Sequence, residues 1–260
     1  MRRARLILLA GCVLYSAWMI APLLGSELSP LYSYVSETGS VGQPNAQFFR
    51  ATDLLAGTAF VVAAALAHRA ARPVPKLALV ALVGLFVLGA ATMCDALMPL
   101  SCTPTADAAC AAREAAGQVP LTHVGHAVSS GIAGFGGVVA VLAWGLWRRS
   151  SGFDGARLPL GMGVAYLLAT AWTLAAMLEP ALYLGLAQRS QVLTLTLWLV
   201  LLATSPHARR PRDRQLHAQP PAEPPRADRG TPHSPRRSAA AAAPSRPNRH
   251  DGSAPPRAAP

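Results

Sequence analysis

Six stretches of the chain are apolar over lengths that approach the roughly 20 residues needed to cross a bilayer as an α-helix. They lie at about 6–25, 49–67, 77–99, 120–147, 158–178 and 182–203. Only 13% of all residues are charged, whereas a soluble domain carries about 25%. Because backbone groups in lipid must satisfy one another, spanning runs of this kind form helices. The sequence therefore predicts an all-α polytopic membrane protein with a six-helix transmembrane bundle over 1–203.

The segment 204–260 has a different composition from the rest of the chain. It contains 13 prolines, 11 arginines, a run of alanines and few large apolar residues. A segment of this kind cannot bury enough apolar surface to fold alone. We expect a disordered, basic cytoplasmic tail, whose arginines attract anionic lipid headgroups by about 1 kcal/mol each when they lie near the surface.

The distribution of lysine and arginine indicates the orientation of the bundle. With the N-terminus inside, 20 of the 23 basic residues fall in cytoplasmic segments, and the outer side holds only Arg50, Arg113 and Arg189. Basic residues accumulate in cytoplasmic loops. We therefore expect a bacterial plasma (inner) membrane protein with both termini in the cytoplasm. The net charge of +11 is then a property of the inner side, and it is no evidence for nucleic-acid binding.

Two cysteines, Cys102 and Cys110, lie in the outer loop between the third and fourth predicted helices. Because that side of a bacterial membrane is oxidising, we expect a disulfide between them. Closing so short a loop contributes roughly 2–3 kcal/mol on the chain-entropy model. The alternative is a thiol metal site, but the loop offers no further cysteine or histidine.

Four ionisable residues interrupt the apolar runs at similar depth: Asp53, Asp95, His126 and Arg189. At 1.5 Å per residue, each lies about 6–10 Å inside the outer end of its predicted helix. A charge inside a membrane costs at least about 2.5–3.5 kcal/mol, so it is normally paired, solvated or functional. The common depth predicts one shared polar site.

One interpretation of this site is a structural network of charges. In it, Arg189 and Arg50 neutralise Asp53 and Asp95. The first outer loop, rich in hydroxyl groups yet partly apolar, folds over the site as a cap with Glu37 pointing down. Such interhelical polar pairs average only about 0.6 kcal/mol, but they fix which helices meet. A site for a small anion, a lipid headgroup or a proton path is a further possibility.

The other interpretation is a metal site. His123 and His126 are three residues apart and project from neighbouring positions of one helical face. Two imidazoles and the carboxylate of Asp95 leave an open position on zinc, which lowers the pKa of bound water to about 7. In this interpretation Asp95, His123, His126 and Arg189 are the candidate catalytic residues. Arg189 or Ser130 would stabilise developing charge.

Small residues are concentrated in the fourth predicted helix. Gly131, Gly134, Gly136 and Gly137 lie within seven residues of one another. Small side chains allow helices to approach closely in lipid. We expect this helix to pack tightly against its neighbours.

Several segments resemble a bacterial six-span family catalogued as domain of unknown function 998. They are 28–30, 35–37, 42–44, 49–53, 94–99 and 185–189, together with Gly57, the Cys102/Cys110 loop and His123/His126. The resemblance covers roughly 5–203. It implies a six-helix membrane protein and supplies no activity.

A looser similarity is to the alkaline ceramidase and adiponectin receptor group of seven-span hydrolases. That group places Ser, Asp and three His around zinc near one membrane face. The similarity implies that Asp95, His123 and His126 take such parts here. The departures are six spans in place of seven and the lack of a third intramembrane histidine.

Two functions follow as hypotheses. The first is a non-enzymatic membrane protein with a polar site beneath its extracytoplasmic face, which binds or moves a small polar or lipid ligand or organises partners. The second is a zinc-dependent membrane hydrolase that acts on a lipid or another amphiphile.

Overall fold

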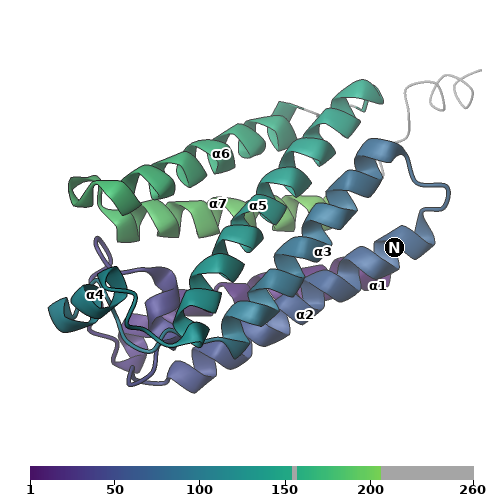
Figure 1. Cartoon of the computed structure of the whole chain (residues 1–260). Coiled ribbons are helices and arrows are strands. Elements are labelled where there is room, and N and C mark those ends of the chain that lie inside the picture. Colours follow the sequence, from purple (N-terminus) through teal and green to yellow (C-terminus); the bar gives the residue numbers. More distant parts are fainter. Residues whose placement is uncertain (154–156, 206–260) are drawn as a thin grey trace, which may run out of the picture. The chain divides into compact units, whose positions relative to one another are not determined.

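The computed structural model describes residues 1–153 and 157–205, and every regular element in these ranges is a helix (Figure 1). The elements are α1 (Arg2–Tyr15), η1 (Ala17–Leu24), η2 (Val35–Gly39), α2 (Ala46–Ala70), α3 (Lys76–Leu97), α4 (Ala108–Ala115), α5 (Leu121–Ser150), α6 (Arg157–Leu178), η3 (Pro180–Leu182) and α7 (Leu184–Thr204). Six helices are long and apolar enough to span a membrane: α1 continued by η1, α2, α3, α5, α6 and α7. The prediction of an all-α six-span protein is confirmed. The expected disordered tail lies, from 206 onward, outside the described residues.

The first span differs from the single helix expected over 6–25. It is α-helical to Tyr15 and then continues as the tighter 3₁₀ helix η1. At the change, the Ser16 hydroxyl donates to the Cys12 carbonyl at 2.8 Å. Pro22 lies inside η1, where it supplies no backbone N–H for an α-helical bond.

The six spanning helices form a closed ring of neighbours. α1 packs on α2, α2 on α3, α3 on α5, α5 on α6, α6 on α7, and α7 returns to α1. Figure 1 shows α3 between α2 and α5, and α6 running beside α7. Side chains such as Phe60, Leu88 and Trp198 fill the interior and are almost completely buried. A ring of this kind has an interior to which every helix contributes.

Glycines set the two closest helix contacts. A Cβ built on Gly57 would lie 2.6 Å from the Gly89 carbonyl oxygen, which brings α2 and α3 together. A Cβ on Gly84 would lie 2.6 Å from the Ala140 amide and 2.8 Å from the Gly136 carbonyl, at the contact of α3 with α5. Backbones can approach this closely only where the side chain is a hydrogen atom.

The connections at one end of the bundle carry most of the irregular structure. We call this the loop end: it comprises 25–45, 98–120 and 179–183. The short helix α4 lies within it, away from the N-terminus (Figure 1). Helix α4 was not predicted from the sequence. Its first turn is capped by Asp107, whose carboxylate accepts from the Ala109 amide at 2.9 Å.

Candidate functional site

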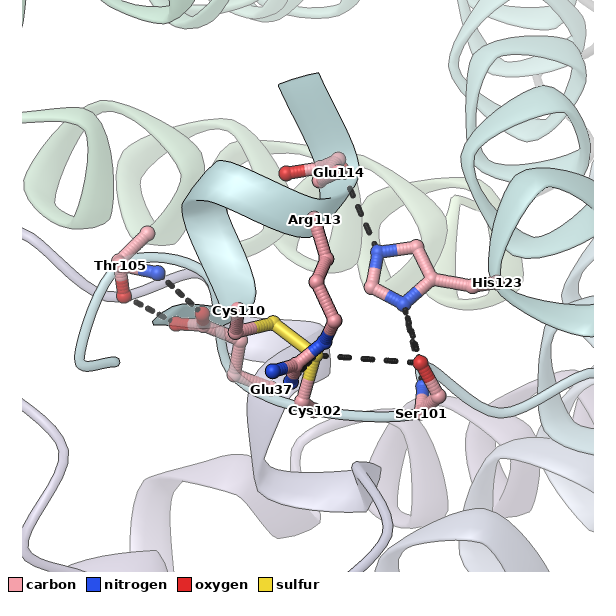
Figure 2. Close-up of polar contacts among 8 residues, drawn as sticks. All are labelled: Glu37, Ser101, Cys102, Thr105, Cys110, Arg113, Glu114 and His123. Atoms are coloured by element: carbon pink, nitrogen blue, oxygen red, sulfur yellow. Dashed lines mark hydrogen bonds and ion pairs between the residues drawn. A yellow bond between two sulfur atoms is a disulfide. The ribbon is translucent and has the colours of Figure 1, made fainter. Parts of the chain in front are cut away.

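Glu37 holds the first loop against the loop between α3 and α4. Its carboxylate accepts the Tyr34 amide at 2.9 Å, which closes a capping box in η2. It also accepts the amide of Thr105 at 2.9 Å and the Thr105 hydroxyl (Figure 2). Glu37 is 0% exposed. The two loops are therefore joined through one buried carboxyl group, and we call 26–45 with its partners the cap.

Burial raises the pKa of the Glu37 carboxyl above its ordinary value of 4.5, and the hydrogen bonds from Thr105 and Tyr34 offset this only in part. Because the folded value exceeds the unfolded one, the contribution of this group to stability is complete at low pH. It is lost as the pH rises through the folded value. The cap should therefore be held most firmly when Glu37 is protonated.

We expect the difference in unfolding midpoint, wild type minus Glu37→Gln, to fall as the pH is raised from about 4 to about 8. Glutamine does not titrate, so any packing change adds only a constant offset. Thermal unfolding of the detergent-solubilised proteins across this pH series measures the difference. Glu27→Gln, at an exposed position in the same loop, is the control and should give a flat difference. A flat difference for Glu37→Gln as well would contradict the raised pKa.

The predicted disulfide between Cys102 and Cys110 is confirmed, with its Cα atoms 6.0 Å apart. His123, 1% exposed, lies beside it at the start of α5. The His123 Nδ1 accepts the Ser101 amide at 3.1 Å, and its Nε2 lies 3.3 Å from Glu114 in α4 (Figure 2). These contacts tie α4 and the disulfide loop to α5.

The chain Ser101–His123–Glu114 has the residue types of a nucleophile, a base and an orienting carboxylate. The Ser101 hydroxyl lies 3.0 Å from His123 Nδ1. However, the single lone pair of that nitrogen already accepts the amide of Ser101. His123 Nδ1 is therefore not free to take the proton of the Ser101 hydroxyl. These contacts instead hold the loop in place against α5.

Arg189 fastens the cap from α7. Its Nη1 lies 3.0 Å from the Pro30 carbonyl, 2.8 Å from that of Ser33 and 3.0 Å from that of Gly185. Its guanidinium carbon lies 5.9 Å from the centre of the Trp18 ring. The neighbouring Gln188 side chain accepts the Val35 amide. Helix α7 thus satisfies backbone groups of the cap that have no partner in a regular element.

The expected pairing of arginines with the intramembrane carboxylates is not formed. Within 1–153 and 157–205, neither Arg50 nor Arg189 makes an ion pair with Asp53 or Asp95. The carbonyls of the cap occupy Arg189. Arg50 packs its methylene groups near Gly39. Glu37 likewise turns to Thr105 and is absent from the lining of the site below.

Beneath the cap lies a cavity of about 110 Å³. All six spanning helices contribute to its wall, and the cap contributes from above. The lining residues are Tyr15, Trp18, Val35, Ser36, Thr38, Phe49, Thr52, Asp53, Leu88, Thr92, Asp95, His126, Ser130, Ala133, Gly134, Tyr166, Gln188, Gln191, Val192 and Leu195. Three of the four ionisable residues expected at one depth are among them. They lie within about 11 Å of the loop ends of their helices at 1.5 Å per residue.

Asp95 is fixed by hydroxyl groups of α5. Its Oδ1 accepts from the Ser129 hydroxyl, and its Oδ2 accepts from Ser130 at 3.1 Å. His126 Nδ1 lies 3.9 Å from Oδ1. Asp95 is thus held in place by two hydroxyl groups of α5.

His126 lines the cavity, and one of its ring nitrogens has no hydrogen-bond partner in the described chain. Its Nδ1 lies 3.2 Å from the Asp95 carbonyl and 3.0 Å from that of Met98. Because carbonyls only accept, Nδ1 carries the proton in the neutral ring and Nε2 carries the lone pair. The Nε2 atom is buried and has no hydrogen-bond partner in the described chain. The residue is 8% exposed.

Asp53 also lacks a partner. In the described ranges no hydrogen bond and no ion pair reaches its carboxyl group, although it lines the cavity with Asp95 and His126. Asp53 is half-buried, and buried polar groups are nearly always paired in folded proteins. The Asp53 carboxyl group and His126 Nε2, both from residues that line the cavity, have no partner within the described chain.

Sequence reasoning missed the uncharged polar residues of the wall. Tyr15, Thr92, Tyr166, Gln188 and Gln191 all line the cavity. The available signal was the pair of amides, Gln188 and Gln191, at the start of an apolar run. A polar amide within a membrane-spanning helix indicates a position that faces the interior of the bundle, as a charged side chain does.

The two histidines expected to bind zinc lie in different surroundings. His126 faces the cavity, whereas His123 faces Ser101 and Glu114 in the loop end. Within the described residues no group of three or more His, Cys, Asp and Glu side chains is placed to hold a metal. The zinc site stays a prediction, which the geometry of His123 does not favour.

A family model described as "Protein of unknown function (DUF998)" matches residues 8–205 of the chain. No curated protein and no solved structure matches. The likeness to alkaline ceramidases and adiponectin receptors gains no support from these comparisons. The match covers the bundle from residue 8, within α1, onward, together with the cap and the cavity. This polytopic membrane protein therefore belongs to the DUF998 family.

Proposed function

We propose that the protein binds a small polar ligand in the cavity beneath the cap. The observation that carries this proposal is that His126 Nε2 is buried without a hydrogen-bond partner, while the half-buried carboxyl group of Asp53, in the lining of the same cavity, also has none. Leaving a buried acceptor without a partner costs about 1–3 kcal/mol. Proteins break such local rules chiefly at functional sites.

A purely structural network would look different. Its members would satisfy one another, as Glu37 and Thr105 do in the cap. The cavity instead contains two kinds of polar group. Asp95 is held by hydrogen bonds from two serines, whereas other groups have no hydrogen-bond partner in the described chain. Fixed groups supported by neighbours are what a preorganised binding site requires.

The loop end is placed on the extracytoplasmic side in this proposal. Nine basic residues of the described chain lie towards the opposite end, and Arg50, Arg113 and Arg189 lie towards the loop end. The positive-inside rule then puts both termini in the cytoplasm of a plasma membrane. The arginine-rich 204–260 segment would face anionic headgroups of the inner leaflet.

The hydrolase hypothesis is less well supported by the contacts. It needs Asp95, His123 and His126 on one metal ion, and His123 is turned towards Ser101 and Glu114. Binding requires only the groups that already line the cavity.

Native mass spectrometry of protein released directly from membrane vesicles tests the proposal. We expect wild type to carry a small-molecule adduct that His126→Leu and Asp53→Asn lose. Glu114→Gln, whose side chain is exposed in α4, is the matched control and should keep the adduct. No adduct on wild type, or the same adduct on all four proteins, would contradict binding in this cavity.

A further inference from the structure

The wall of the cavity carries two carboxyl groups, those of Asp53 and Asp95, and its described lining includes neither lysine nor arginine. His126 is held by two carbonyls in a tautomer that presents an acceptor. We propose that the ligand is a small organic cation with N–H donors, of the amidinium or primary ammonium class. This inference rests on the proposed function and names the chemistry of its ligand.

The pattern of satisfied and unsatisfied groups points to donors on the ligand. Asp95 receives hydroxyl donors from Ser129 and Ser130. Asp53 receives no hydrogen bond within the described chain, and neither does His126 Nε2. A carboxylate accepts only, and so does the unprotonated nitrogen of an imidazole. A ligand that completes this wall must bring hydrogen atoms on nitrogen or oxygen.

The two carboxyl groups of the wall, with no lysine or arginine among the described lining residues, point to a positive ligand. Arg189 is the basic residue of α7, and its donors are directed to carbonyls of the cap and of its own helix. Buried charges are paired or coordinated in folded proteins, and ionisable groups inside a membrane pair with one another or mark substrate pathways. A cation in the cavity supplies the partner that the arginines do not.

The remaining wall suits an organic ion. The rings of Tyr15 and Tyr166 line the cavity, and aromatic rings attract alkylated or delocalised cations. A volume of about 110 Å³ admits an ion of a few heavy atoms. No set of three metal-ligating side chains is found in the described residues, which favours an organic cation over a metal ion.

Three probes of nearly equal size and shape test the inference: acetamidinium, acetamide and acetate. They carry positive, zero and negative charge on the same planar frame. Isothermal titration of the full chain in neutral detergent, with chloride held constant, gives the affinity of each. We expect acetamidinium to bind about tenfold or more tightly than acetamide, and acetate to give no heat. Asp53→Asn should lose the preference for acetamidinium, whereas Glu114→Gln should keep it.

The comparison on wild type decides the charge preference without any variant. Equal binding of acetamide and acetamidinium, or tighter binding of acetate, would overturn the inference and leave the proposed function standing. Absence of binding by all three probes, with a wild-type adduct still seen by mass spectrometry, would also overturn the cation class alone. Absence of both binding and adduct would overturn the proposed function as well.

Discussion

Gly84→Val is expected to lower the free energy of unfolding by about 3 kcal/mol or more. A Cβ at this position meets the Ala140 amide at 2.6 Å and the Gly136 carbonyl at 2.8 Å. These are backbone atoms of α5, so no side chain can rotate away and the whole of α5 must move from α3. Because His126 and Asp95 lie on these two helices, the cavity should open together with the contact.

The matched control is Gly131→Val, in the same pair of helices. No heavy atom lies within 4 Å of the Cβ position at Gly131, so its effect should stay within about 0.5 kcal/mol. Unfolding in a detergent mixture, followed by circular dichroism, gives both values. Equal effects for the two valines would contradict the close α3–α5 contact.

Removal of the disulfide is expected to have the second largest effect. Cys102→Ala/Cys110→Ala should cost about 2–3 kcal/mol, because the bond closes a loop of eight residues in sequence separation. Two residues near this bond hold the loop in place by hydrogen bonds. Ser101 contacts His123, and Thr105 contacts Glu37. Loosening this loop should therefore release both the α5 contact and the cap.

A reductant provides a second way to measure the same effect. Reduction of wild type should lower its thermal midpoint to that of the double alanine variant, and reduction of the variant should change nothing. Cys94→Ala, an exposed free cysteine of α3, is the control and should behave as wild type. An unchanged midpoint after reduction would show that the loop is held by its hydrogen bonds alone.

The depth of the polar residues could be predicted from the sequence, and their partners could not. Asp53, Asp95 and His126 lie near the loop ends of three different helices, and counting residues at a fixed rise places them at one level. The depth of a residue does not tell in which direction its side chain points around the helix axis. His123 and His126 differ by three residues, yet one faces the loop end and the other the cavity.

The partner of Arg189 shows a second limit of sequence reasoning. Opposite charge made Asp53 and Asp95 the expected partners. The guanidinium instead donates to the carbonyls of Pro30 and Ser33. Folding of the cap is what brings these carbonyls within reach of Arg189. Backbone groups of irregular segments carry no signal in composition, but each must be satisfied when buried.

Glycines illustrate the same difference between position and contact. The cluster in α5 correctly predicts a tight helix contact, and Gly136 is at its centre. Gly131, five residues before Gly136 in the same helix, faces open space. Gly57 is the one glycine of α2, and Gly84 and Gly89 lie five residues apart in α3. Only the packed structure reveals that they contact other backbones.

The most direct test of the central claim is the unfolding midpoint of Asp53→Asn beside that of wild type, both dialysed free of ligand. If Asp53 binds a ligand, its carboxyl group has no partner in the ligand-free protein. Replacing that group then removes no contact, and the midpoint should stay equal or rise. If Asp53 belongs to a structural network, the midpoint should fall by about 4 °C or more, since about 1 kcal/mol shifts it by about 2–4 °C at this size. An equal or higher midpoint is the result expected of a binding site, and a lower one would contradict it.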